Sequence, residues 1–316
     1  LPVGQLVTSP YLPAVKAAVD VKARDVGLDL APGAYVHTLP NIAGYVGADH
    51  VAMLLATEVG ETEGVALALD IGTNTEVCLV NEGGMTSVSC ASGPAFEGAQ
   101  IKHGMRAAKG AIEYLELTED GIRYQTIDGG PPAGLCGSGV LDALAELFRK
   151  GVVDASGRMR EGPGVRTSNG LREFVLVSDA EREQGAVTIT QKDVRELQLA
   201  KGAIRAGIWC LLESEDLTEA DIDEVVIAGA FGSYIDVVSA IAIGMLPPLA
   251  ETTFRQVGNA AGMGAKLALL SRSKRAEAGE IADRTQYIEL STHPAFKRSF
   301  ARATQLGGAQ SGLGRS

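Results

Sequence analysis

The stretch ALDIGTNTE, residues Ala68–Glu76, decides the fold. A continuous apolar run, Val65–Leu69, predicts a buried strand that ends at Asp70, and a second apolar run begins at Glu76. Between the runs, Gly72 allows the backbone to come close to a ligand, so that successive N–H groups can point at an anion. Hydroxyl and amide side chains that can add hydrogen bonds follow it: Thr73, Asn74 and Thr75. The pattern predicts a phosphate-binding hairpin.

Asp70 adds a carboxylate at the end of the first strand of this hairpin. It can hold Mg²⁺ through water, because Mg²⁺ keeps several of its waters when it binds to proteins. The alternative interpretation is a tight hairpin closed by an Asx turn, with no ligand.

Two further glycine-rich turns adjoin an expected strand or helix. Val225–Ser233 (VVIAGAFGS) is a buried strand that runs into a small turn, which could receive adenine and ribose against bare backbone. Gly134–Gly139 (GLCGSG) precedes a helix and resembles an anion-binding helix N-terminus. It is not a Walker A motif, because no lysine follows the last glycine. Ordinary strand-to-helix and helix-entry turns remain the alternatives.

The elements around these motifs alternate between strands and helices, which predicts an α/β fold. Small residues on one side of a helix expected over Asn41–Ala56 indicate that another backbone packs closely against it. Residues 152–186 are polar and glycine-rich and are expected to be irregular. The other expected strands are Glu76–Val80, Met85–Cys90, Val225–Ala228 and Tyr287–Leu290, and the other expected helices are Ser138–Lys150, Thr190–Ser214, Asn259–Leu270 and Phe296–Gln305.

The composition limits the partners. The formal net charge of −11 argues against nucleic acid and against an anionic membrane surface, since no basic stripe could neutralise phosphates. No apolar run reaches the ~18–20 residues needed to span a bilayer. Cys78, Cys90, Cys136 and Cys210 form no C-x-x-C pair, so we expect buried reduced thiols and no iron–sulfur or zinc site from this chain alone. The four histidines share no ligand spacing, and Trp209 is expected in the core.

The order of the motifs resembles the superfamily of actin, sugar kinases and heat-shock chaperones. That resemblance implies an actin-like (ribonuclease-H-like) two-lobed ATPase fold, in which Asn41–Ala56 and Gly258–Leu270 are the connecting helices. The first phosphate motif, D-x-G-x-T, is missing from residues 1–40, so the first lobe is expected to be truncated. We expect residues 1–64 to be the remainder of the first lobe with its connecting helix, 65–271 the second lobe, and 272–316 a C-terminal strand–helix extension.

Several longer segments together resemble the C-terminal region of the reductive activators of corrinoid proteins. They are HTLPNIAGYVGADHVA (His37–Ala52), ALDIGTNTE, SGPAFEGAQI (Ser92–Ile101), GLCGSGVLD (Gly134–Asp142), QKDVRELQLAKGAI (Gln191–Ile204), AGAFG (Ala228–Gly232) and GNAAGMGAKLALL (Gly258–Leu270). The resemblance implies a homodimeric ATPase, and reduced thiols fit a cytoplasmic location. The partners of such an ATPase would be a corrinoid protein and a ferredoxin-type domain whose 2Fe-2S cluster donates the electron that restores Co(I) from Co(II). That cluster would belong to an N-terminal domain that this sequence lacks.

The same resemblance implies roles for individual residues. Asp70 would organise Mg²⁺, and Glu76 would orient the attacking water. The predicted nucleotide-binding residues are Gly72, Thr73, Asn74, Thr75, Glu97, Gly98, Gly137, Ser138, Lys201, Gly229, Ala230 and Gly232. For Lys201 the alternative is a solvated helix lysine.

Two other functions fit the same fold. A kinase for a sugar or a small carboxylic acid would need a carboxylate base beside the substrate hydroxyl. A chaperone-like nucleotide switch would change its assembly or its client binding without redox chemistry. A phosphorylated product would distinguish the kinase, because the fold alone does not fix the reaction.

Overall fold

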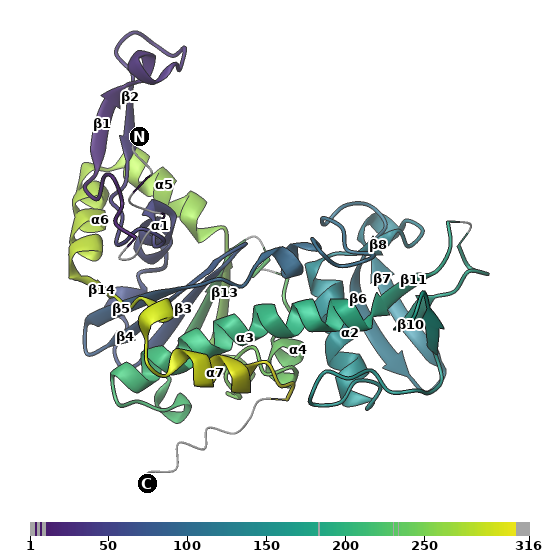
Figure 1. Ribbon diagram of the computed structural model, residues 1–316. Helices are drawn as coiled ribbons and strands as arrows, with labels where there is room; N and C mark the ends of the chain where they lie inside the picture. Colours follow the sequence, from purple (N-terminus) through teal and green to yellow (C-terminus); the bar gives the residue numbers. More distant parts are fainter. Residues whose placement is uncertain are drawn as a thin grey trace.

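The computed structural model describes residues 4, 7, 11–182, 184–229, 231, 232 and 234–307. A six-stranded sheet with helices on both faces forms one part of the molecule (Figure 1). A smaller part with two three-stranded sheets lies at one end of it, and a two-stranded ribbon projects at the other. Among the described residues, no helix has the length and apolar character that a membrane span requires.

The six-stranded sheet has the order β13-β12-β3-β4-β5-β14. Its first three strands in sequence are antiparallel neighbours, whereas β12 runs parallel to β3, and β13 runs parallel to β12. This order and these directions form the expected ribonuclease-H-like core. The strands are β3 (Ala66–Ile71), β4 (Thr75–Asn81), β5 (Gly84–Cys90), β12 (Glu224–Ala228), β13 (Phe254–Gly258) and β14 (Thr285–Tyr287).

Side-chain alternation along β3 gives the two faces of this sheet different partners. Leu67 and Leu69 pack into the core that contains helix α3 (Gln191–Ser214), along which α7 (Phe296–Ala303) lies. Ala66 and Ala68 face the other core, which α1 (Ala48–Thr57), α5 (Ala260–Leu270) and α6 (Arg272–Arg284) cover. The small side chains on that face allow the helices to approach the sheet closely.

Helices α1 and α5 cross at backbone distance. A Cβ atom at Gly264 would clash with the carbonyl oxygen of Ala52 and would lie 2.8 Å from its Cα. This contact confirms the close packing expected of the two small-residue helices. The helix expected over Asn41–Ala56 nevertheless begins only at Ala48, because a turn precedes it in which the Ile42 amide bonds to the Val46 carbonyl at 3.0 Å.

The smaller part contains strands that the sequence did not predict. Residues 152–186, expected to be irregular, include β9 (Val165–Ser168) and β10 (Leu171–Val177), which pair with β11 (Val187–Thr190) in one antiparallel sheet. Phe174 and Leu176 of β10 are buried, so a half-buried strand lies within a polar segment. The second sheet contains β6 (Ala111–Thr118), β7 (Gly121–Thr126) and β8 (Gly134–Leu135), and it packs against α2 (Gly137–Arg149).

Other boundaries also differ from expectation. Helix α2 begins at Gly137, one residue before the expected start at Ser138, and Cys136 occupies its N-cap. The charged helix α6 was not expected, and the last strand lies at Thr285–Tyr287 instead of Tyr287–Leu290. Helix α3 begins as predicted, after a capping box formed by Thr190 and Asp193. The remaining elements are the projecting ribbon β1 (Val19–Lys22) with β2 (Tyr35–Thr38), and the short helix α4 (Val237–Ala242).

Candidate nucleotide site

The β3–β4 hairpin forms one wall of a cavity of about 360 Å³. Its turn is closed by a hydrogen bond from the Gly72 amide to the Asn74 carbonyl, at 3.1 Å. Asp70 and Glu76 are directly opposite each other in the pairing of the two strands. The cavity is lined by Gly44, Tyr45, Gly47, Asp49, Asp70, Gly72, Thr73, Asn74 and Glu76. The structure thus brings five of the predicted residues together in one place.

Thr75 has a supporting position. Its hydroxyl lies 3.0 Å from the hydroxyl of Ser92, which in turn donates to the Thr73 carbonyl at 3.4 Å. Thr75 is buried and does not line the cavity. Its contact with Ser92 therefore ties the turn to the loop after β5.

Three carboxylates make the cavity strongly electronegative. Burial, and then the charge of Asp49, raise the pKa of Asp70 to about 6. Burial likewise raises the pKa of Glu76 to about 7, and the hydroxyl of Ser89, which donates to Glu76 at 2.9 Å, only partly offsets this. Such a site favours a bound cation or protons over three ionised carboxylates. Asp49, in the first turn of α1, was missed by the sequence reasoning because no local motif marks it.

These oxygen ligands fit Mg²⁺, which prefers carboxylates, phosphates and water. In the part of the chain that the structure describes, no group of three or more acidic, histidine or cysteine side chains is placed to enclose a metal ion by itself. Asp70 would therefore hold Mg²⁺ together with water and substrate oxygens.

The glycine-rich turn after β12 lies next to Asp70. Gly229 has a φ of +98°, and a Cβ atom there would lie 3.1 Å from Asp70 Oδ1 and would clash with the carbonyl oxygen of Ile71. Gly232 is equally confined, by the carbonyl of Ala228. Ala230 lies outside the described residues. The predicted phosphate and adenosine turns are therefore neighbours, because β12 pairs with β3.

A second, more apolar cavity of about 620 Å³ is lined by Glu97, whose carboxylate accepts a hydrogen bond from Thr73 of the first cavity. The rings of Phe96 and Phe231 are stacked beside it, with centroids 5.4 Å apart and planes 14° from parallel. Three predicted residues line it, Glu97, Gly137 and Ser138. The other lining residues are Phe96, Met105, Arg106, Ala107, Glu113, Ile127, Cys136, Phe231 and Tyr234.

Two glycines near this cavity allow neighbouring segments to pack closely against their backbone. A Cβ atom at Gly137 would clash with the carbonyl oxygen of Phe96 and lie 2.6 Å from the ring of Phe231. Gly98 has a φ of +81°, and a Cβ atom there would lie 2.6 Å from the amide nitrogen of Met105. Gly98 lines neither cavity, so it acts on the site only through its backbone packing against Met105.

Lys201 lies outside both of these cavities. It is fully buried in α3 and lines neither cavity, and its Nζ donates a hydrogen bond to the carbonyl oxygen of Gln305. Burial lowers the pKa of Lys201 to about 7. The interpretation as a solvated lysine is therefore wrong, and the placement gives no support to a contact with nucleotide. Sequence periodicity could not reveal this, because the partner is a carbonyl about a hundred residues away.

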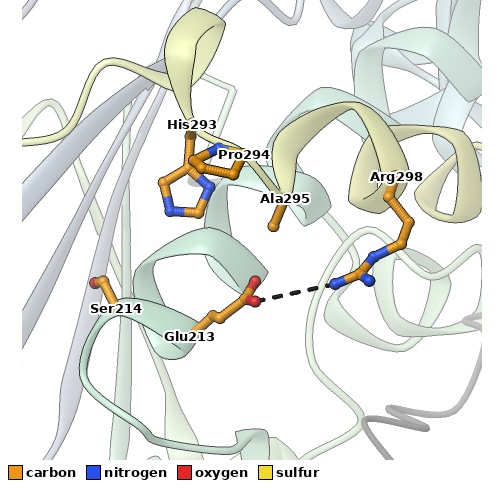
Figure 2. Close-up of a pocket in the computed structure, with 6 residues that line it drawn as sticks. All are labelled: Glu213, Ser214, His293, Pro294, Ala295 and Arg298. Atoms are coloured by element: carbon orange, nitrogen blue, oxygen red, sulfur yellow. Dashed lines mark ion pairs between the residues drawn. The ribbon is translucent and has the colours of Figure 1, made fainter.

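The four cysteines lie outside the lining of the carboxylate cavity, and a further cavity lies between α3 and α7. Cys78, Cys90, Cys136 and Cys210 are all buried and free, as expected. Figure 2 shows a separate cavity of about 450 Å³, where Arg298 of α7 approaches Glu213 of α3 at 4.0 Å. That cavity shares no lining residue with the two described above.

The fold, with its two adjoining glycine-rich turns, defines a protein of the actin-like fold class. The family described as the C-terminal domain of RACo, the ASKHA domain, matches residues 64–313, and the RACo middle region matches residues 1–62. The chain therefore belongs to the RACo family, that of the reductive activators of corrinoid proteins.

Individual relatives agree with this family. The corrinoid activation enzyme RamQ of Eubacterium limosum is 38% identical over 310 residues, which cover 95% of this chain and 52% of the relative. A Co(II) methylated amine-specific corrinoid protein reductase of Methanosarcina barkeri is 27% identical, over 83% of this chain and 49% of the relative. Among solved structures, a reductive activator for a corrinoid, iron–sulfur protein matches 96% of this chain and 49% of its own, with 40% identity and a TM-score of 0.89. This chain spans about half the length of these relatives.

Proposed function

We propose that this chain is the ATP-binding and ATP-hydrolysing part of a reductive activator. The activator would use ATP to drive an electron from an iron–sulfur cluster to the Co(II) of a corrinoid protein, which restores Co(I). The observation that carries the proposal is the placement of Gly229 against Asp70 at the turn of the β3–β4 hairpin, in a chain whose relatives are named as corrinoid activators.

In this proposal the nucleotide extends across both cavities. Its phosphates lie at the turn of the hairpin, where Gly72, Thr73 and Asn74 supply backbone and side-chain donors. Its base occupies the apolar cavity beside Phe96 and Phe231, because aromatic faces suit a flat base. Mg²⁺, when bound near Asp70, supplies charge neutralisation for the phosphates.

Glu76 is the proposed residue that orients the attacking water. It lines the phosphate cavity, and the hydroxyl of Ser89 fixes one of its oxygens. Its pKa of about 7 suits a group that accepts a proton near neutral pH. Asp49 adds negative charge that makes the same cavity dependent on a cation.

The coupling to electron transfer would depend on differential affinity. ATP can promote the reduction only if it binds the two states of the activator–corrinoid complex with different free energies. The electron would come from a ferredoxin-type domain with a 2Fe-2S cluster outside this chain, since the four cysteines here are buried and form no C-x-x-C pair. We further propose a homodimer, as the family resemblance implies, and a cytoplasmic location, which reduced thiols fit.

The experiment measures MgATP hydrolysis by the protein and by its Asp70→Ala variant, with and without a Co(II) corrinoid protein. Hydrolysis that rises with the corrinoid protein and is lost in the variant is the expected result. A hydrolysis rate that is the same with and without the corrinoid protein would contradict the proposal. A phosphorylated sugar or carboxylate as the product would favour the kinase instead.

A further inference from the structure

The short 3-10 helix η4 (Pro94–Glu97) lines the apolar cavity with Phe96 and Glu97. At its end, Glu97 Oε1 accepts a hydrogen bond from Thr73 Oγ1 at 2.5 Å. Thr73 lines the phosphate cavity and Glu97 lines the apolar one, so this hydrogen bond joins the walls of both. The neighbouring residue, Phe96, stacks on Phe231.

The two glycines that flank η4 differ in how closely other atoms surround them. Gly93 and Gly98, at its two ends, both have left-handed backbone, with φ of +72° and +81°. A Cβ atom at Gly93 would meet nothing within 4 Å, whereas Gly98 is held against the backbone of Gly104 and Met105. The segment therefore has an open hinge at one end and an anchored joint at the other.

The hydroxyl of Thr73 has a single hydrogen to donate. It cannot donate to Glu97 and to a phosphate oxygen at the same time. The Glu97 carboxylate would also face the negative charge of a phosphate bound at the turn, and like charges at short distance repel. A phosphate that takes the Thr73 hydroxyl must therefore release Glu97.

We propose that residues Gly93–Gly98 are a nucleotide-sensing switch, in which Glu97 and the bound phosphate compete for the hydroxyl of Thr73. This inference rests on the proposed binding of nucleotide at the hairpin. Release of Glu97 turns η4 about Gly93 and shifts Phe96 against Phe231 and against Gly137 at the start of α2. The switch thereby transmits the presence of phosphate to the smaller part of the molecule.

Hydrogen exchange of residues 94–99 reports this motion, because the amides of Gly98 and Ala99 bond to the carbonyls of Ala95 and Pro94 at 3.1 and 3.2 Å. MgATP is expected to raise their exchange rate about threefold in the wild-type protein, since these local bonds loosen. Adenosine, which lacks phosphate, is expected to leave the rate unchanged. Equilibrium dialysis with radiolabelled MgATP and adenosine shows in parallel that each ligand is bound.

Two variants assign the effect to Glu97. Glu97→Ala should exchange fast without nucleotide, gain nothing from MgATP, and bind MgATP about tenfold more tightly because the competing carboxylate is gone. Glu97→Gln keeps an acceptor for Thr73, so it should start with slow exchange and still respond to MgATP. Glu119→Gln, which removes an exposed carboxylate at the β6–β7 turn, should behave as wild type.

The outcomes separate the two proposals. If MgATP binds and the exchange of residues 94–99 stays constant, the switch is wrong and the proposed function stands. A Glu97→Ala variant that responds as wild type, or that binds MgATP more weakly, also overturns the switch. If the wild-type protein binds no MgATP, both proposals fail.

Discussion

Gly229 follows Ala228, the residue that pairs with Asp70 across β12 and β3, and a methyl group added at Gly229 would lie 3.1 Å from the carboxylate oxygen of Asp70. The turn expected at the adenosine and the carboxylate expected at the metal are thus adjacent, although about 160 residues separate them. This contact is possible only because Gly229 has no side chain and a φ of +98°.

Gly229→Ala should therefore disturb the site through Asp70. We expect about a hundredfold loss of MgATP hydrolysis, because a displacement of about 1 Å at a reacting group has effects of this size. The control is Gly170→Ala, at a φ of +77° with nothing within 4 Å of an added Cβ. It should lose about 1 kcal/mol of stability from backbone strain and keep its hydrolysis rate. Equal losses of activity in the two variants would show that strain alone is responsible.

Glu76→Gln tests the orientation of the attacking water. The amide keeps the acceptor for Ser89 but cannot take up a proton, so kcat for MgATP hydrolysis should fall about a hundredfold. KM should change little, because the substitution leaves the turn at Gly72–Asn74 intact. A variant whose KM rises while kcat is kept would place Glu76 in binding and not in the chemical step.

The crossing of α1 and α5 predicts a large effect of a small substitution. Gly264→Ala should lower the free energy of unfolding by about 1–3 kcal/mol in urea titrations, since its methyl group would clash with Ala52. Gly279→Ala, in α6, has no heavy atom within 4 Å of the added methyl group and should gain up to about 1 kcal/mol. Changes of opposite sign in the free energy of unfolding of these two variants would show that the loss at Gly264 comes from the crossing of α1 and α5.

The buried Lys201 predicts a pH-dependent stability. Burial lowers the pKa of Lys201 to about 7 in the folded protein, from 10.5. As the pH falls from about 10 to 7, the unfolded chain takes up a proton at this lysine that the folded chain does not. The free energy of unfolding therefore falls by about 1.4 kcal/mol per pH unit. Lys201→Met should therefore gain stability relative to wild type over this range, with no further gain below pH 7.

The control for this prediction is Lys297→Met, which removes an exposed lysine of α7. Its stability difference from wild type should be the same at every pH. A Lys201→Met difference that is equally constant would mean that Lys201 is charged in the folded protein at neutral pH.

The local elements of the site were predictable because their signals lie within a few residues of each other. The apolar runs around Asp70 and the turn at Asn81–Gly84 predict β3, β4 and β5, and positive φ at Glu82 and Gly83 closes the hairpin as expected. The helix expected over Thr190–Ser214 likewise agrees with α3 to within one residue. Here local propensity and tertiary packing favour the same structure.

Other features depend on contacts that no short segment records. Helix α6 buries only Ala278, Ile281 and Ala282, so its charged sequence gave little sign of a helix in the core. Asp49 lines the same cavity as Asp70 because α1 packs against the sheet that contains β3. Lys201 belongs to the contact between α3 and α7, and its burial follows from the position of Gln305. These placements arise from packing between distant segments.

The central claim is that ATP bound at this site drives the reduction of a corrinoid. The direct measurement is the visible spectrum of a Co(II) corrinoid protein mixed with the activator and a reduced iron–sulfur donor, with and without MgATP. We predict that Co(I) accumulates only with MgATP and that Asp70→Ala abolishes this accumulation. Co(I) that forms equally without MgATP, or equally with Asp70→Ala, would contradict the account.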